Sequence, residues 1–539
     1  MDNEWWKGAV IYQVYPRSFQ DSNDDGIGDL KGITERLEYI SSLGIDAIWI
    51  SPFFKSPMKD YGYDVSDYRD IDPIFGTLAD FDELLIKSHE LGIKIIIDLV
   101  LSHTSDQHPW FLQSTQDKNN DKADWYVWAD PKIVDGEKCP PNNWVSLFGG
   151  CAWEYNESRD QYYLHNFLTE QPDLNFHNLQ VQKAVLDICG FWLERGVDGF
   201  RLDVVNFYFH DKELRDNPER REDVPYATQF EEDVPYSRQQ HLYDKSRPEN
   251  LDFLKKLRAL TDNYEGRVLI GEIGDDRPIT RSKEYTKGHN RLHTCYNTKL
   301  MSGTHKVLKP ETIIEPVEYY LGEQENQTEL DTHRTGWPSW AFSNHDVVRA
   351  ASRWFAPYDH DPTFSKLLLA VLGCLPGSVF LYQGEELGLP EAKIAYEDLH
   401  DPWAKQTWPA WQGRDGCRTP IPWSKVTPQN PYAGFSFAKP WLPIPETHYL
   451  LTHDKQDHNP DSVLNFTRTF LNWRKNQPAL LKGSYEFLDK INEDLLVLKR
   501  KHHKHETFCI FNFSTKQRTY ENHILKKYEA KISGFNFEE

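Results

Sequence analysis

The chain has 539 residues, more than one ordinary hydrophobic core accommodates, which predicts one large domain with insertions or two to four units. Hydrophobic residues make up 39% and charged residues 27%, a composition typical of a globular protein. The net charge of −22 argues against nucleic acids and anionic membranes as partners.

The cysteines, the N-terminal residues and the apolar segments indicate the cellular compartment of the protein. There are seven cysteines, an odd number, and no Cys-x-x-Cys, which fits a reducing compartment better than a disulfide framework. The opening MDNEWWKGAV lacks the layout of a signal peptide. The longest uncharged apolar run, Leu367–Tyr382, contains Gly and Pro and is too short to span a bilayer. We therefore expect a cytoplasmic protein that does not bind membranes.

Strand and helix patterns alternate over the first hundred residues. Strands are predicted at 9–16, 45–52 and 93–100, and helices at 30–44 and 77–91. The third strand is apolar until Asp98, as in a parallel sheet covered on both faces. The repeat of strand, helix and strand is typical of an α/β barrel or a doubly wound sheet.

The rest of the chain extends this pattern, with two interruptions and a tail. The further predicted strands begin at Gly199 and lie at 267–273, 293–301, 339–346 and 378–383. The further predicted helices lie at 181–195, 251–263, 361–373 and 460–474. Residues 211–250 are predicted as a polar loop with a short helix, and 385–459 as a Trp- and Pro-rich loop.

We predict an α/β fold built on a (β/α)₈ TIM barrel. The barrel comprises residues 1–103 and 173–483. A loop-rich, irregular β domain at 104–172 is inserted after the third strand, and short alternating runs at 484–539 predict a C-terminal antiparallel β domain.

The stretch GFRLDVVN at Gly199–Asn206 ends a strand with two charges. Side chains at i and i+2 of a strand point to the same face, so Arg201 and Asp203 emerge side by side. A nearby Arg lowers the pKa of a carboxyl group, and an ionised, oriented carboxylate is what a covalent nucleophile needs. A structural ion pair that closes the strand explains this stretch equally well.

Charged residues also end other predicted strands: Asp98 with His103, Glu272, and His345 with Asp346. The carboxyl ends of barrel strands converge on one face, so a single site explains all of these residues at once.

Two carboxylates that flank a bond fit glycoside hydrolysis with retention of configuration. Asp203 is the candidate nucleophile. Glu272 follows the apolar run VLIG, where burial and negative neighbours are expected to raise its pKa, and is the candidate general acid and base.

The segment DSNDDGIGDL at Asp21–Leu30 offers oxygen atoms at alternate positions. The candidate ligands are Asp21, Asn23, Asp25 and Asp29, an all-oxygen set that suits Ca²⁺ or Mg²⁺. The twelfth position is Gly32 instead of Glu, so the loop is not an EF-hand. A polar turn is the alternative to a metal loop.

Another motif, RKHHKH at Arg500–His505, fits an exposed hairpin turn, with metal binding as the alternative.

The sequence resembles the α-glucosidases of glycoside hydrolase family 13, the α-amylase family, over nearly its whole length. The resembling motifs are DLVLSH at 98–103, QPDLNF at 171–176, GFRLD at 199–203, GEI at 271–273 and SNHD at 343–346.

This resemblance implies roles for particular residues. It implies that Asp203 is the nucleophile, Glu272 the acid/base and Asp346 the stabiliser of the transition state. It implies that a small oligosaccharide or disaccharide is bound by Asp60, Tyr63, His103, Arg201, Val204, His345 and Arg414. In the oligo-1,6-glucosidase branch, the carbonyl of Ile27 would join Asp21, Asn23, Asp25 and Asp29 around a structural Ca²⁺ or Mg²⁺, and no organic cofactor is implied. Asp60 and Arg414 fit a branch that removes one glucose from a chain end.

Two cues to the glycosidic linkage conflict. Val204 follows the nucleophile, where Val goes with α-1,6 bonds and Ala or Thr with α-1,4 or mixed specificity. The context, including GRDGCRTP at 413–420, looks more like α-glucosidases that favour short α-1,4 substrates. A glucosyl transferase, a sucrose isomerase and a trehalose-6-phosphate hydrolase remain alternatives on the same scaffold. A non-catalytic relative would lack the three acids.

Overall fold

The computed structural model describes residues 4–224, 234–301, 307–324, 327–333, 335–355, 360–409 and 411–536. Eight parallel strands form a closed barrel in the order β1-β2-β5-β11-β12-β13-β14-β15. Their bounds are β1 Val10–Val14, β2 Ala47–Ile50, β5 Lys94–Leu99, β11 Gly199–Leu202, β12 Val268–Gly271, β13 Thr294–Asn297, β14 Trp337–Ala341 and β15 Ser378–Tyr382. The predicted (β/α)₈ barrel is confirmed, and each strand lies within two residues of a predicted start or inside a predicted range.

Side-chain burial explains why these segments form the barrel. Except for Lys94, which is partly exposed, every residue of the eight strands is buried, as expected for strands covered on both faces. The parallel register pairs Val10 of β1 with Val379 of β15. Gly199 opposes Val268 across β11 and β12, and a Cβ atom at Gly199 would lie 2.3 Å from the Val268 carbonyl oxygen. Only glycine therefore allows this close approach of the two strands.

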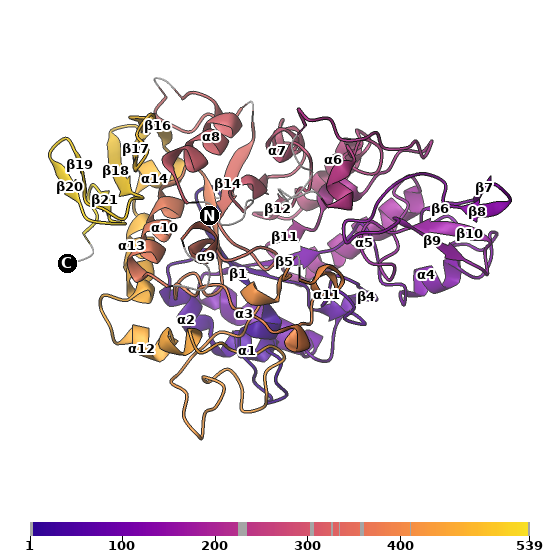
Figure 1. Cartoon of the computed structure of the whole chain (residues 1–539), viewed down its shortest axis with the longest axis horizontal. Helices are drawn as coiled ribbons and strands as arrows, with labels where there is room; N and C mark the ends of the chain where they lie inside the picture. The colour runs from indigo at the N-terminus through magenta and orange to yellow at the C-terminus, as the bar shows by residue number, and fades with distance from the viewer. Residues whose placement is uncertain are drawn as a thin grey trace. The chain divides into compact units, whose positions relative to one another are not determined.

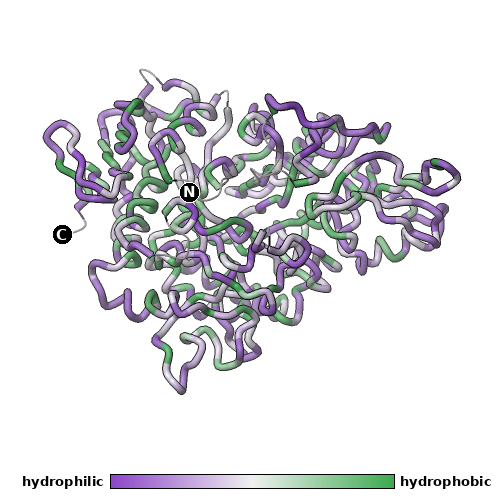
Figure 2. Tube along the Cα trace, in the orientation of Figure 1, coloured by the Kyte–Doolittle hydropathy of each residue, from purple (hydrophilic) through white to green (hydrophobic). Residues whose placement is uncertain are grey.

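Helices follow most barrel strands. The longer ones are α3 Leu78–Glu90, α5 Leu179–Arg195, α6 Asn250–Thr261, α7 Pro278–Thr286, α8 Pro310–Leu321, α10 Pro362–Cys374 and α13 Val463–Arg474. The shorter ones are α1 Leu30–Glu35, α2 Leu37–Ser42, α4 Pro109–Ser114, α9 Ala350–Trp354, α11 Pro402–Thr407, α12 His453–Asp457 and α14 Pro478–Lys482. In Figure 2, hydrophobic residues concentrate along α10, whereas peripheral loops are mainly hydrophilic. None of the described helices has the length and hydropathy needed to cross a bilayer.

The segment predicted as an inserted domain is mostly short strands and loops. It contains β6 Trp128–Ala129, β7 Lys132–Val134, β8 Glu137–Cys139, β9 Trp153–Asn156 and β10 Gln161–Leu164. Strands β6, β10 and β9 form an antiparallel sheet over a core that includes Trp144 and Trp153. The helix α4 was not predicted. The domain boundaries at 104 and 172 stay predictions.

The C-terminal segment forms antiparallel sheets, as predicted (yellow in Figure 1). The larger sheet has the order β16-β17-β18-β21, and β19 pairs with β20. The bounds are β16 Ser484–Leu488, β17 Leu495–His502, β18 His505–Asn512, β19 Arg518–Tyr520, β20 His523–Leu525 and β21 Ala530–Ile532. Apolar residues on alternate positions of β17, Leu495 and Val497, pack with Ile510 and Leu525.

Two predicted loops differ in detail from the structure. The stretch 385–459 contains α11 and α12 as well as loops, so the prediction of loop alone is wrong there. In the polar stretch 211–250, a short 3₁₀ turn occurs at Pro235–Arg238, and residues 225–233 lie outside the described residues. A small antiparallel pair, β3 Phe54–Lys55 and β4 Asp67–Ile71, precedes α3.

The chain divides into two compact units. One comprises Met1–Ser51, Ile74–Ile96 and Tyr296–Glu539, and the other comprises Pro52–Pro73 and Ile97–Cys295.

Candidate active site

Arg201, on β11, organises the acids of the second unit. Its side chain is fully buried, and its Nη1 donates to Asp203 Oδ1 at 2.6 Å and to Asp98 Oδ1 at 2.8 Å. Its Nη2 lies 2.6 Å from Glu272 Oε2. One guanidinium therefore holds three carboxylates that come from the ends of three strands, β5, β11 and β12.

The sequence predicts that Arg201 lowers the pKa of Asp203 and so keeps its carboxylate ionised. Arg201 does act in that direction, but the net result is the opposite. The pKa of Asp203 lies well above its ordinary value, because burial of the carboxyl group outweighs the attraction of Arg201. Repulsion from Glu272 and Asp98 raises the pKa further. The carboxyl group of Asp203 therefore binds a proton more readily than that of an exposed Asp does.

Val204 connects the nucleophile candidate to Glu272. Its backbone lies in the left-handed region, with φ 33° and ψ 50°, which is unfavourable for a β-branched residue. This conformation lets the Val204 N–H donate to Glu272 Oε2 at 3.2 Å. The next N–H, of Val205, donates to the Glu272 carbonyl oxygen at 3.0 Å. Both the side chain and the backbone of Glu272 are thus held by the turn after β11.

A buried polar group surrounds His103 in the same unit. Its Nε2 lies 3.0 Å from the Tyr63 carbonyl oxygen and 3.1 Å from Gln171 Nε2, and Gln171 Nε2 donates to Asp60 Oδ2 at 3.3 Å. The Tyr63 hydroxyl donates to Asp98 at 3.3 Å, which links this group to Arg201. Burial lowers the pKa of His103 to about 4, so its imidazole is neutral at pH 7.

The first unit holds a second polar group around Asp346, which follows β14. Arg418 Nη2 donates to Asp346 Oδ1 at 2.8 Å, and Arg414 Nη1 does so at 3.4 Å. His345 Nε2 lies 3.2 Å from Asp346 Oδ2, and its Nδ1 lies 2.7 Å from Gln13 Nε2. The Asp346 side chain is 21% exposed, whereas those of Arg418 and His345 are buried.

Arg414 is itself fixed by a second carboxylate. Its Nε and Nη2 donate to the two oxygens of Asp401 at 3.0 and 2.8 Å, a bidentate pair. Arg414 and other cations lower the pKa of the buried Asp401, which is therefore ionised. The guanidinium of Arg414 is held at one orientation.

The predicted sugar-binding and catalytic residues fall into these two groups. The second unit brings together Asp60, Tyr63, His103, Arg201, Asp203, Val204 and Glu272, and the first brings together His345, Asp346 and Arg414. The sequence gives no particular role to Gln13, Gln171, Asp401 and Arg418, and it places Asp98 only among the charged residues at strand ends. Three of these five residues lie in the quoted motifs, namely Asp98 in DLVLSH, Gln171 in QPDLNF and Arg418 in GRDGCRTP.

Comparison with known proteins decides the family. The sequence matches the family model "Alpha amylase, catalytic domain" over residues 13–483. The chain belongs to the α-amylase family. A "Probable alpha-glucosidase" of Rhizobium meliloti is 53% identical over 525 residues, covering 96% of this chain and 91% of that protein. An "Oligo-1,6-glucosidase" of Heyndrickxia coagulans is 36% identical over 537 residues, covering 95% of this chain and 92% of that protein.

Solved α-amylase-family structures have the same fold. The α-glucosyl transfer enzyme XgtA superposes with a TM-score of 0.91 at 49% identity, covering 98% of this chain and 99% of XgtA. The trehalulose synthase MutB of Pseudomonas mesoacidophila superposes with a TM-score of 0.83 at 29% identity, covering 98% of this chain and 97% of MutB. The family thus includes relatives described as glucosidases, as an α-glucosyl transfer enzyme and as a trehalulose synthase.

The predicted metal loop of this α-amylase-family chain is tightly curled. Asp21 accepts hydrogen bonds from the N–H groups of Asn23 at 3.0 Å and Gly26 at 2.8 Å, and Asn23 and Asp25 accept from the N–H two residues ahead. The oxygen donors fit a hard cation by type. The carboxylates of Asp21, Asp25 and Asp29 are not among the described groups whose ligand atoms all lie within 4.8 Å of one another. An ion would therefore have to draw them closer.

Proposed function

We propose that this protein is a retaining, exo-acting α-glucosidase. It releases glucose from the non-reducing end of short α-glucosides of the maltose or isomaltose type. The observation that carries the proposal is the buried guanidinium of Arg201, which holds the side chains of Asp203 and Glu272 together in a chain of the α-amylase family.

The electrostatics of this cluster suit a retaining mechanism. Three carboxylates and one guanidinium have a net charge of −2 when every group is ionised. Burial disfavours this excess of negative charge. The raised pKa of Asp203 reflects this cost. The reaction needs an ionised Asp203 and a protonated Glu272, so we propose that the one proton retained by the cluster lies on Glu272 when the substrate is bound.

The proposed reaction has two steps. Asp203 attacks the anomeric carbon and forms a covalent glucosyl ester, while Glu272 gives its proton to the departing glycosidic oxygen. Glu272 then takes a proton from water, which attacks the same carbon, releases glucose of α-configuration and regenerates the Asp203 carboxylate. The resemblance gives Asp346 the role of stabilising the oxocarbenium-like transition state, and Arg418 orients its carboxylate.

We propose that five side chains bind the hydroxyl groups of the sugar, namely those of Asp60, Tyr63, His103, His345 and Arg414. A neutral imidazole both donates and accepts one hydrogen bond, as a sugar hydroxyl does, and the lowered pKa of His103 supports this role. The ion pair of Arg414 with Asp401 supports a rigid contact at the end of the bound sugar. Removal of one glucose from a chain end is proposed from the resemblance at Asp60 and Arg414.

We also propose a structural Ca²⁺ or Mg²⁺ held by the side chains of Asp21, Asn23, Asp25 and Asp29 and the carbonyl of Ile27. Its support is the all-oxygen donor set on a curled loop. A cytoplasmic location remains a proposal, supported by seven cysteines that are all free thiols.

Asp203→Asn and Glu272→Gln test the roles of the two carboxylates. Hydrolysis of maltose should fall by about 10²–10⁴ in Glu272→Gln, because proton transfer is lost, and at least as much in Asp203→Asn. With an activated aryl α-glucoside, Glu272→Gln should still form the glucosyl ester, which azide then releases as the α-azide. An Asp203→Gly variant should instead give the β-azide, because azide attacks directly.

Asp198→Asn is the matched control. Asp198 is a buried acid immediately before β11, at the other end of the strand from Asp203, and pairs with Arg267 at 3.2 Å. It should keep maltose hydrolysis within about tenfold of the unaltered enzyme. Near-normal hydrolysis by Asp203→Asn or Glu272→Gln, or first release of β-glucose, would overturn the proposal.

Glucosyl transfer is the second candidate, favoured by the 49% identity to an α-glucosyl transfer enzyme. Product analysis at high maltose separates the two: glucose alone indicates hydrolysis, and longer saccharides indicate transfer. Parallel incubations with isomaltose, sucrose and trehalose distinguish the α-1,6-specific and sucrose-converting alternatives.

A further inference from the structure

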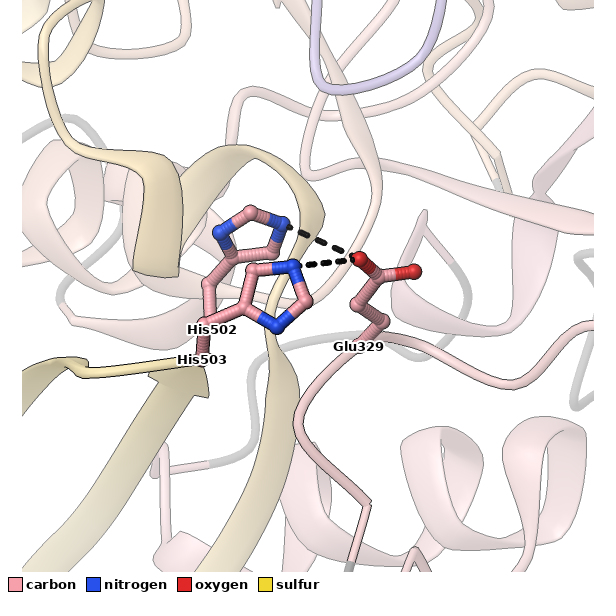
Figure 3. A group of neighbouring side chains, drawn as sticks. All are labelled: Glu329, His502 and His503. Atoms are coloured by element: carbon pink, nitrogen blue, oxygen red, sulfur yellow. Dashed lines mark ion pairs between the residues drawn. The ribbon is translucent and has the colours of Figure 1, made fainter.

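The turn between β17 and β18 brings two histidines against one glutamate outside the candidate active site (Figure 3). His503 Nε2 lies 2.9 Å and His502 Nε2 lies 3.6 Å from the same oxygen, Oε1, of Glu329. The hairpin predicted from RKHHKH is present, since His502 pairs with His505 across the two strands. The active site uses none of these three side chains.

The backbone explains why both imidazoles reach the same carboxylate. Consecutive side chains of a strand point to opposite faces. His502 is the last residue of β17, and His503 adopts a left-handed conformation with φ 51°. The change of direction at His503 places the two rings side by side, with centroids 4.5 Å apart, and both point toward Glu329 (Figure 3).

Glu329 lies on a segment that is fixed on both sides. The Thr328 carbonyl oxygen accepts from the His503 N–H at 3.2 Å, and the Gln327 carbonyl oxygen accepts from the Ser484 hydroxyl at 2.8 Å. On the other side, the N–H of the buried Leu330 donates to the Lys482 carbonyl oxygen at 2.9 Å. The carboxylate is therefore presented by backbone that is already attached to the hairpin.

The spacing of the three side chains suits a tetrahedral metal ion. Metal–nitrogen and metal–oxygen bonds of about 2.0–2.2 Å at a tetrahedral angle place ligand atoms roughly 3.3–3.6 Å apart. The observed separations of 2.9 and 3.6 Å bracket these values. Within the described parts of the chain, this is the one group of three or more His, Cys, Asp or Glu residues whose potential ligand atoms all lie within 4.8 Å of one another.

We propose that His502, His503 and Glu329 bind a divalent transition-metal cation, of which zinc is the best match. Two imidazoles and one carboxylate are the protein ligands of known zinc sites that keep a fourth position for water. The side chains of Glu329 and His503 are 60% and 62% exposed, so the fourth position faces solvent. Imidazole ligands disfavour Ca²⁺ and Mg²⁺, which separates this site from the Asp21–Asp29 loop.

The bound ion would act as a cross-link. It would join the segment around Glu329 to the β17–β18 turn, and so stabilise the folded chain in proportion to its saturation. Glu329 and His503 are exposed, so the site is accessible from solvent without any rearrangement of the core.

Zinc titration of the full chain, produced without a histidine tag and in excess Ca²⁺, tests the proposal. Calorimetry and metal analysis after gel filtration should show one zinc ion that is lost, or weakened at least tenfold, in Glu329→Gln and in His503→Asn. Asparagine is chosen at 503 because it tolerates the left-handed conformation. The control His523→Asn alters an exposed histidine of β20 and should leave zinc binding unchanged.

Thermal unfolding gives a second measurement. Zinc should raise the midpoint temperature of unfolding of the unaltered protein and of His523→Asn, but not that of the Glu329→Gln/His503→Asn double variant. Without metal, the three proteins should unfold at the same midpoint temperature. Equal zinc stoichiometry and affinity in the unaltered protein and the double variant, or no zinc bound by the unaltered protein, would show that the cluster is an ion pair only.

Discussion

At the scale of single residues, Arg201 shows what the sequence predicts and what it leaves open. The spacing of Arg201 and Asp203 predicts that they share a face of β11, and they do. The contact with Glu272 depends on the register of β11 against β12, which pairs Leu202 with Gly271 and is set by backbone packing at Gly199. The pKa of Asp203 is raised because burial by the whole fold outweighs the effect of Arg201, and no local spacing reveals that burial.

Val204 provides a test of linkage preference at this scale. Val204 follows the candidate nucleophile Asp203 in the sequence. Its N–H donates a hydrogen bond to Glu272 Oε2 at 3.2 Å. We expect Val204→Ala to lower the ratio of kcat/KM for isomaltose to that for maltose severalfold. A change of two methyl groups in an apolar contact is worth about 1–3 kcal/mol. Steady-state kinetics on the two disaccharides measures the ratio.

Val205→Ala is the control for this prediction. Val205 is fully buried, so its truncation should lower thermal stability by creating a cavity, yet leave the substrate ratio unchanged. A Val204→Ala enzyme with the ratio of the unaltered protein would contradict the role of this residue in selecting the linkage.

At the scale of elements, most of the eight barrel strands were predictable because they are short, buried and largely apolar runs. Strand β13, with the sequence TCYN, is buried but not an apolar run. The predicted helix 30–44 is two helices in the structure, since Arg36 leaves helical geometry where its guanidinium bonds Gln20 and lies 4.2 Å from the Trp423 ring centroid. The helix α8 was missed and contains Pro316, a residue that normally ends a helix. Helices of five or six residues, such as α11, are less than two turns long, so the sequence shows no repeating hydrophobic period for them.

The Asp21–Asp29 loop gives a prediction for one element. If it holds a divalent cation, chelation should lower the thermal midpoint of the unaltered protein, and added Ca²⁺ or Mg²⁺ should restore it. Asp21→Asn and Asp25→Asn should remove this dependence, because each loses a charged ligand. Thermal unfolding with and without a chelator measures the difference.

Asp24→Asn is the control within the same loop. Asp24 is exposed, has φ 64° and is not a predicted ligand, and asparagine tolerates that conformation. This variant should keep the full response to the cation. Identical chelator responses in Asp24→Asn and Asp21→Asn would argue for a polar turn instead of a metal loop.

At the scale of the whole molecule, the C-terminal sheet is joined to the helices of its unit by a buried arginine. Arg500 of β17 is fully buried and donates to the carbonyl oxygens of Cys374 at 2.6 Å, Gly483 at 2.9 Å and Leu480 at 3.2 Å. These carbonyls end α10 and α14, where the helix dipole favours a cation. The sequence shows only a charged residue in an alternating strand, so this role was not predictable.

Arg500→Leu should therefore destabilise the protein strongly. Its removal leaves several buried carbonyl groups without a donor, at a cost on the order of 3–5 kcal/mol in the free energy of unfolding. Arg518→Leu is the control, since Arg518 pairs with Asp494 at a half-exposed position and should cost under about 1 kcal/mol. Equal losses in the two variants, measured by urea denaturation, would rule out the capping role.

The pairing of β1 with β15 also determines when the barrel can close during synthesis. The N–H of Gly8 donates to the hydroxyl of Ser378, a contact that spans 370 residues. At translation rates of about 5–20 residues per second, the N-terminal strand waits roughly 20–75 s on the ribosome for its last neighbour. During that interval its open edge can recruit strands of other nascent chains. Slow production at low temperature and chaperone protection of the emerging N-terminus should therefore improve the yield of folded protein.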